Sequence, residues 1–170
     1  KNIVEKFGFE KVYKQGFNIK TPLNLYLQNT ATGSLRKGLI EYDQRKGWRG
    51  SIVNKKVVKD WNKGLNDYDL EKSLGWKIAI VKKINQFSVE IETEDKKNGV
   101  IKTGGISWTK KKIENLFNVG DIIYVKEINN NLYQLKQLPK VNGAIVIMDP
   151  FTGRVFALSG GFSFKKSEFN

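Results

Sequence analysis

The sequence has 170 residues, of which 39% are hydrophobic and 12% aromatic, enough for one domain with a core or for one domain flanked by parts of another. It contains no cysteine and no histidine, which excludes thiol nucleophiles, disulfides, Ser-His-Asp triads and the common zinc sites. The net charge of +13 points to a polyanionic partner, but 26 of the 30 cationic residues are lysine, and a solvated lysine-rich surface is the simpler explanation. No signal peptide follows Lys1 and no apolar run reaches the length of a membrane span, so we expect any targeting segment to lie upstream or to have been removed.

The first third of the sequence predicts one helix after an irregular or extended lead-in over residues 1–20. Thr21-Pro22 is typical of a helix start, with Thr21 as the cap and Pro22 at the first helical position, where no hydrogen bond is lost. An apolar residue every four positions predicts a single packing face on a helix that runs to about Gln44, and Gly47–Gly50 ends it. That face consists of Leu23, Leu27, Ala31, Leu35 and Leu39. Residues 51–75 predict a connecting loop with short helical turns.

After Gly75 the apolar period changes from four residues to two, which indicates strands. We expect strands over 76–84, 87–93 and 100–106, a short helix capped by Thr109, a fourth strand ending at Ile128, and a fifth over 132–138. In the second strand Phe87, Val89 and Ile91 should face the core, and Ser88, Glu90 and Glu92 the solvent. Three strands, a helix and two strands predict a mainly β fold, a five-stranded OB-type Greek-key barrel; an SH3-like barrel usually lacks that helix.

The last thirty residues have a different character. Residues 143–148 form an almost unbroken apolar strand, which favours a sheet covered on both faces, and residues 149–153 turn the chain into a return strand over 154–158. The barrel offers nothing to cover such a hairpin. We therefore expect a larger domain to begin here, and both ends of the sequence look cut.

Three segments resemble class A penicillin-binding proteins of the 1A type. The hairpin from Gly143 to Gly161, with Phe162-Ser163-Phe164 and 167–170 after it, is similar to the opening hairpin of their transpeptidase domain. Thr21-Pro22-Leu23 with Leu27-Gln28 resembles the segment after their glycosyltransferase domain, and residues 42–50 resemble the approach to their OB insert. Where this sequence has Pro22, that family often has threonine.

The resemblance implies a division into three parts: a linker and helix over 1–45, an OB-fold insert over 46–139, and the first, truncated hairpin of a transpeptidase domain over 140–170. The parent protein would be a peptidoglycan glycosyltransferase and D,D-transpeptidase on the periplasmic side of the bacterial inner membrane, with its anchor outside this chain. Its partners would be peptidoglycan or its lipid-linked precursor, and β-lactams at the transpeptidase site. The OB domain would space the two enzymes and dock a regulatory protein or glycan.

We interpret this sequence as lacking the complete set of catalytic motifs of that family. A transpeptidase needs a serine activated by a lysine three residues later, a second serine motif and a Lys-Thr-Gly strand. Lys102-Thr103-Gly104 matches the last and three Ser/Lys pairs match the first, but lysine is so abundant that chance explains them. The pairs are Ser34/Lys37, Ser107/Lys110 and Ser163/Lys166. We predict no catalytic residue, cofactor or metal site here: the nucleophile should follow Asn170, and the glycosyltransferase acids should precede Lys1.

A second hypothesis is a free OB domain that binds single-stranded nucleic acid through stacking aromatics. Its candidate stacking residues are Trp76, Phe87, Trp108, Tyr124 and Tyr133, although the alternation of Phe87 with Val89 places Phe87 in the core. The terminal hairpin favours the first hypothesis, because a nucleic-acid-binding OB protein has no use for it, and makes nucleic acid the less favoured partner. Under either hypothesis we expect the interaction surface to include Trp48, Arg49, Trp76, Trp108, Tyr124 and Tyr133.

Overall fold

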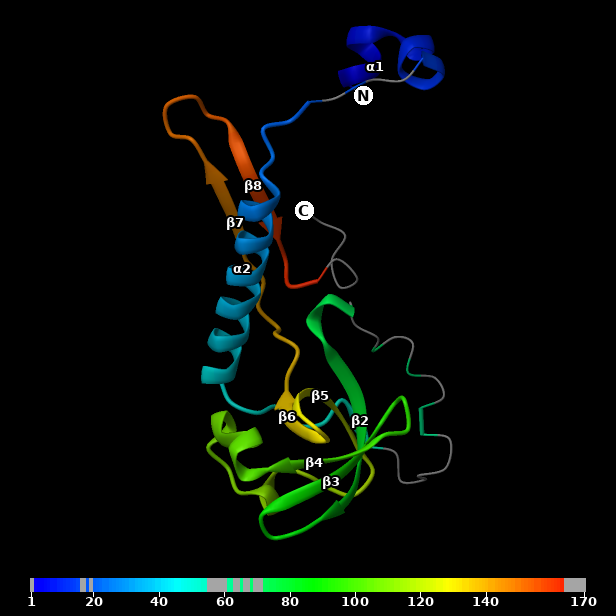
Figure 1. The fold of residues 1–170 in the computed structure, drawn as a ribbon, viewed down its shortest axis with the longest axis vertical. Coiled ribbons are helices and arrows are strands. Elements are labelled where there is room, and N and C mark those ends of the chain that lie inside the picture. Colours follow the sequence, from blue (N-terminus) through cyan, green and yellow to red (C-terminus); the bar gives the residue numbers. More distant parts are fainter. Residues whose placement is uncertain are drawn as a thin grey trace.

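The computed structural model describes residues 2–15, 18, 20–54, 61–62, 65, 68 and 72–163. Apart from the N-terminal piece that contains α1, Figure 1 shows two parts joined by two chain segments. One part is the long helix α2 (Leu25–Arg45) beside a hairpin of β7 (Ala144–Met148) and β8 (Val155–Gly160). The other is a β-barrel formed by the residues between them in sequence, so the chain leaves α2 for the barrel and returns from the barrel to the hairpin.

The N-terminal region differs from the expected irregular lead-in, because it contains α1 (Asn2–Phe7) and a π-helical turn, η1 (Lys11–Gln15). The expected helix start at Thr21-Pro22 is also wrong. Helix α2 begins at Leu25, and its cap is Asn24, whose side-chain oxygen accepts a hydrogen bond from the amide of Leu27 at 3.0 Å. The amide of Asn24 donates to the carbonyl of Phe156 in β8 (2.9 Å), and this bond fixes the chain on the hairpin before the helix begins.

Helix α2 packs along the hairpin through the predicted apolar face. Ala31 and Leu39 are buried, whereas Leu23 lies before the helix and is exposed. Gln28 bonds both backbone groups of Leu158: its amide nitrogen donates to the carbonyl (2.9 Å), and its amide oxygen accepts from the N–H (3.0 Å). The edge of β8 is therefore satisfied by a helix side chain. No helix in the described ranges is both long and apolar enough to cross a membrane.

The barrel has the five-stranded closed topology that the sequence predicts. Its strands are β2 (Trp76–Ile84), β3 (Ser88–Thr93), β4 (Asn98–Lys102), β5 (Asp121–Asn129) and β6 (Leu132–Lys136). The order is β5-β2-β3-β4-β6, and β6 pairs back onto β5 to close the barrel. Only the β4–β6 pair among these is parallel. Register shifts in the β2–β3 and β5–β6 pairs provide the local bends that closure of a small barrel requires.

The barrel interior is filled by side chains from every strand and from the connection between β4 and β5. That connection consists of two 3-10 segments, η4 (Thr103–Thr109) and η5 (Ile113–Asn115), instead of one helix capped by Thr109. The expected third strand is accordingly shorter and ends at Lys102. Ile113, Leu116 and Phe117 of this connection are buried.

Phe87 is a further correction. It was expected in the core with Val89 and Ile91, which are indeed buried, but Phe87 itself is 68% exposed. The residue lies in the bend between β2 and β3, one position before the strand, so the alternation of β3 does not apply to it.

The outer face of β2 and β5 is also buried. A second apolar cluster joins Ile78, Ile80 and Ile122 of the barrel wall to Leu39 of α2 and to Phe162 after β8. A two-residue strand that the sequence did not predict, β1 (Val53–Asn54), pairs with β5 at this wall. The barrel and the helix–hairpin part therefore share a core, which opposes rotation of one against the other.

The terminal hairpin is only partly as expected. Helix α2 covers one of its faces, although the sequence did not predict this cover. On the other face Val146, Met148, Val155 and Leu158 are exposed. Strand β7 thus alternates between exposed and half-buried residues, and the strands buried on both faces are β2 and β5.

Candidate functional site

The two chain segments between the barrel and the helix–hairpin part are tied together by a buried carboxylate. Asp43, in the last turn of α2, is 2% exposed. One of its oxygens accepts hydrogen bonds from the Arg49 guanidinium (2.7 Å) and the Lys140 amide (3.2 Å), and the other accepts from the Gln137 side chain (2.8 Å). We call these four residues, Asp43, Arg49, Gln137 and Lys140, the Asp43 clasp.

The clasp joins the outgoing and the returning segments of the chain. Gln137 accepts from the Arg49 amide (2.8 Å) and donates to the Gly47 carbonyl (3.1 Å), while the Arg49 side chain also donates to the Leu138 carbonyl (2.7 Å). Gly47 takes a positive φ of 90° just after the helix, a conformation suited to glycine that turns the chain toward the barrel.

The electrostatics of the clasp favour the charged carboxylate. Burial alone would raise the pKa of Asp43, but the hydrogen bonds from Arg49, Gln137 and Lys140, with the charge of Arg49, outweigh it and hold that pKa below its ordinary value. Asp43 therefore remains ionised at neutral pH and bonded on both oxygens.

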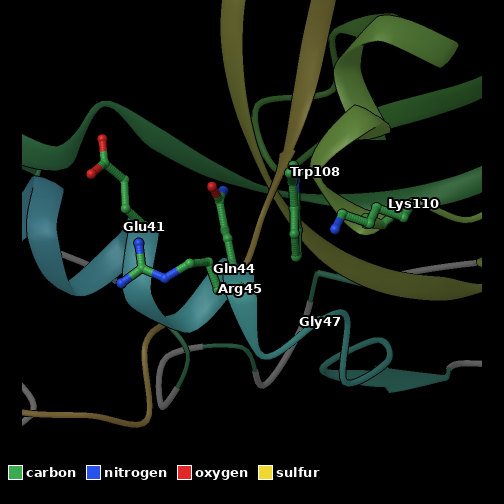
Figure 2. A pocket seen from close by; sticks show the side chains of 7 residues that line it. Glu41, Gln44, Arg45, Gly47, Trp108 and Lys110 are labelled. Carbon is green, nitrogen blue, oxygen red and sulfur yellow. The ribbon is translucent and has the colours of Figure 1, made fainter.

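A groove of about 570 Å³ lies beside the clasp, between the end of α2 and η4. Glu41, Gln44, Arg45 and Gly47 form the helix side, and Trp108, Thr109 and Lys110 the barrel side; we call it the α2–η4 groove. Figure 2 shows the Trp108 ring standing between Gln44 and Lys110. The ring is fixed, because its indole N–H donates to the Leu135 carbonyl (3.1 Å) and it packs nearly perpendicular to the Trp48 ring, with ring centroids 6.0 Å apart.

The structure does not bring the six residues expected at an interaction surface into one site: Trp48, Arg49 and Tyr124 line one hollow, and Trp108 lines the α2–η4 groove. Tyr133 is 0% exposed, so its inclusion in a surface is wrong, and Tyr124 is only 5% exposed. The Tyr133 ring fills the barrel core, and the Tyr124 ring belongs to the cluster that covers the barrel wall. Trp76 is half-buried against Tyr124 and Phe162. Trp48 packs on the barrel core and Arg49 belongs to the clasp, which leaves Trp108 in the α2–η4 groove.

Sequence reasoning missed Asp43, Gln137 and Gln44. A signal for Asp43 was present: it continues the four-residue period of the apolar face of α2 after Leu39, and a charged residue in that register indicates a buried, paired group. Gln137 and Gln44 carried no comparable signal.

The acidic pair of β3 is structural in this chain. Glu90 is exposed and accepts from Asn85 (3.0 Å). Glu92, expected on a solvated face, is half-buried, accepts from the Trp61 indole (2.8 Å) and pairs with Lys82 (3.0 Å). The Trp61 hydrogen bond is the main reason that the pKa of Glu92 lies below its ordinary value. Among the described residues no three potential metal ligands gather at one place.

The outward residues of β3 and β4 include no aromatic ring. The cross-strand pairs Ser88–Lys102, Glu90–Val100 and Glu92–Asn98 occupy this face, where OB folds commonly bind oligonucleotides. Two of the six side chains are acidic. The surface is therefore poorly suited to stacking and to phosphate, and the nucleic-acid hypothesis is not favoured.

The Ser/Lys pairs that match a transpeptidase motif lie in different parts of the chain, and one of their six residues is outside the described ranges. Ser34 and Lys37 are exposed on α2, and the Nζ atom of Lys37 lies 3.9 Å from Oε1 of Glu41. Ser107 and Lys110 lie in and after η4. Ser163 is buried, and its partner Lys166 lies outside the described residues. Lys102-Thr103-Gly104 spans the end of β4 and the start of η4.

We expect the 170-residue chain not to be acylated by a fluorescent penicillin, because Ser34 and Lys37 are exposed on α2 and Lys102-Thr103-Gly104 does not lie within one strand. The measurement is in-gel fluorescence after incubation and denaturation, with a heat-denatured sample as background and an intact penicillin-binding enzyme as positive control. Labelling above background that disappears in Ser34→Ala, Ser107→Ala or Ser163→Ala would contradict the expectation.

The Asp43 clasp and the shared apolar core define a class of protein: an OB-like β-barrel that is fixed to a helix–hairpin unit. The family model described as "Penicillin-binding protein OB-like domain" matches residues 48–141. The chain belongs to this family of penicillin-binding protein OB-like domains, and the class A resemblance of its motifs is confirmed.

Similar proteins agree with this assignment. Penicillin-binding protein 1A of Rickettsia felis is 36% identical over 165 residues, and that of Escherichia coli is 28% identical over 178. Both matches cover 95% of this chain and 21% of the relative, so the chain spans about a fifth of the length of these proteins. The crystal structure of penicillin-binding protein 1A from Haemophilus influenzae superposes with a TM-score of 0.77 at 29% identity, covering 99% of this chain and 26% of that one.

Proposed function

We propose that this chain is the non-catalytic module that spaces and orients the two enzymes of a bacterial peptidoglycan synthase. Residues 1–45 lead from the glycosyltransferase side, 46–139 form the OB insert, and 140–170 open the transpeptidase domain. The parent acts on the periplasmic side of the inner membrane, polymerises lipid-linked precursor and binds β-lactams at its transpeptidase site. A regulatory protein on the OB domain stays a prediction.

The Asp43 clasp carries this proposal. A barrel inserted into another domain enters and leaves by two chain segments, and without further contacts each would act as a hinge. Here one buried carboxylate bonds to both segments, and the apolar cluster of Leu39, Ile80 and Phe162 covers the joint. A module held in one orientation in this way fixes the positions of its two neighbouring domains relative to each other.

The exposed hairpin face supports the placement of residues 140–170 in a larger domain. Val146, Met148, Val155 and Leu158 form an apolar patch on paired strands. Patches of this kind in soluble proteins mark surfaces that another element covers. In our proposal the rest of the transpeptidase domain supplies that cover.

The proposal is tested in the full-length synthase by inserting a flexible Gly-Ser segment into each connection, after Lys46 and after Pro139. The barrel keeps its own fold, while the segments that hold Arg49 and Lys140 against Asp43 become flexible, which weakens the clasp. We expect glycan polymerisation and penicillin acylation, assayed separately, to persist while cross-linking of newly made glycan falls severalfold.

The matched control places the same segment after Asn130, in the turn between β5 and β6, where it lengthens the protein without loosening either connection. Normal cross-linking in the connection variant, or an equal fall in the control, would rule out an orienting role.

A further inference from the structure

We propose that the α2–η4 groove binds glycan, specifically an N-acetylated amino-sugar chain that carries carboxylates. The substrate class rests on the proposed function, whereas the site rests on the groove itself. It is lined by one fixed aromatic ring, an amide side chain and charges of both signs. OB folds bind oligosaccharides as well as oligonucleotides, but through strands 2–3, which here are β3 and β4, and not at this position.

The ring of Trp108 is prepared for a ligand. Its N–H is already bonded to the Leu135 carbonyl and its ring is packed against Trp48, so no further ordering of this side chain is needed on binding. Because Trp108 is only half-buried, part of its ring surface remains available for contact with a ligand. The negatively polarised face of an indole suits the polarised C–H groups on the flat side of a pyranose ring.

The polar groups around the ring match the rest of a sugar. Within the described part of the chain, the Gln44 and Lys110 side chains make no hydrogen bond to another residue, and Figure 2 shows them on opposite sides of Trp108. An amide both donates and accepts, as hydroxyl and N-acetyl groups require. The ammonium of Lys110 can donate a charge-assisted hydrogen bond to a carboxylate.

The charge pattern favours glycan over nucleic acid. Glu41 and Arg45 lie on the helix side of the groove and Lys110 on the barrel side, so a ligand meets two cationic donors and one acidic acceptor. A strand with a phosphate at every nucleotide would place charge against Glu41. An amino-sugar strand with a carboxylate on alternate sugars carries fewer charges per unit length. The hydroxyl groups of its neutral sugars can donate hydrogen bonds to the Glu41 carboxylate.

The position of the groove gives such binding a consequence. Helix α2 forms one wall and η4 of the barrel the other, so a bound sugar contacts both parts of the chain next to the clasp. Glycan in this groove would add to the contacts that fix the barrel.

The experiment titrates the 170-residue chain with a peptide-free tetrasaccharide of alternating N-acetylglucosamine and N-acetylmuramic acid, followed by the Trp108 indole N–H resonance and by calorimetry. We expect saturable binding that shifts this resonance. Lys110→Glu and Gln44→Leu should each weaken binding about tenfold, the effect of losing roughly 1.4 kcal/mol of interaction. Lys102→Glu, an exposed lysine at the end of β4, is the matched control and should change affinity less than about twofold.

Two further ligands separate glycan recognition from simple charge attraction. The neutral N-acetylglucosamine tetrasaccharide should bind more weakly and should be insensitive to Lys110→Glu, since it has no carboxylate. Polyglutamate and a single-stranded oligonucleotide should not displace the muramic-acid tetrasaccharide at physiological salt. The proposal is overturned by the absence of saturable binding, by an unmoved indole resonance, by equal loss in Lys102→Glu, or by displacement by polyglutamate.

Failure here and failure of the orienting function give different results. If the tetrasaccharide does not bind but the Gly-Ser insertions still reduce cross-linking, the module orients the enzymes without contacting glycan. If it binds while the insertions leave cross-linking unchanged, the groove proposal stands and the orienting function fails.

Discussion

Replacing Asp43 with alanine is expected to lower the free energy of unfolding by about 3 kcal/mol, near the lower end of the range for breaking a buried ion pair. The Arg49 guanidinium would lose its counter-charge, and Gln137 and the Lys140 amide would lose their acceptor. The effect is not larger because the Arg49 side chain is 28% exposed and keeps its bond to the Leu138 carbonyl. Chemical denaturation followed by circular dichroism measures the change.

Glu114→Ala, which removes an exposed acid in η5, is the charge-matched control and should change stability by less than about 0.5 kcal/mol. An Asp43→Ala protein as stable as this control would show that the clasp contributes nothing measurable.

The pH dependence gives an independent check of the same prediction. The pKa of Asp43 in the folded protein lies below the unfolded value of about 3.9, so its contribution is complete above that pH and is lost as the pH falls through the folded pKa. The stability difference between wild type and Asp43→Ala should therefore narrow below about pH 4. Glu92 and Asp95 also have lowered pKa values, but both proteins retain them, so they cancel in the difference. A constant difference down to strong acid would contradict the assigned pKa.

The second large effect is expected at Gly105, in η4. A Cβ atom there would lie 2.7 Å from the backbone carbonyl oxygen of Tyr133 and 3.1 Å from the Ile101 side chain. Those residues are partners in the parallel β4–β6 pairing that closes the barrel, so the backbone cannot move away without disturbing closure. Gly105→Ala should destabilise the chain by about 2 kcal/mol, the usual cost of overpacking.

The neighbouring glycine provides the control. A Cβ atom on Gly104 would meet nothing within 4 Å, in the same 3-10 segment. Gly104→Ala is therefore expected to be neutral or to stabilise by up to about 1 kcal/mol through the unfolded state. Denaturation midpoints of the two variants, measured side by side, test this difference in stability. Equal stability would mean that the backbone of β6 moves to accommodate the added Cβ atom at no cost.

The candidate site was much less visible in the sequence than the fold. Trp108 was expected at an interaction surface, and it does line the groove, but Tyr124 and Tyr133 were grouped with it and are buried. Aromatic residues serve equally well in a core and on a surface, so residue type alone does not separate the two roles. Gln44 and Gln137 are ordinary polar residues until the fold gives them partners, and Gln137 lies 94 positions from Asp43.

Local patterns by themselves determined the order of the barrel strands and the family resemblance. A change of apolar period from four to two after Gly75, with turns at regular intervals, depends on neighbouring residues only, and it predicted the closed five-stranded topology. Only the tertiary structure decided which faces are covered: α2 covers one face of the hairpin, and Leu39 with Phe162 buries the outer wall of β2 and β5. The physical reason is that an unbroken apolar run indicates at most that a second face is covered, whereas the element that covers it is distant in sequence and leaves no signal of its identity in the strand.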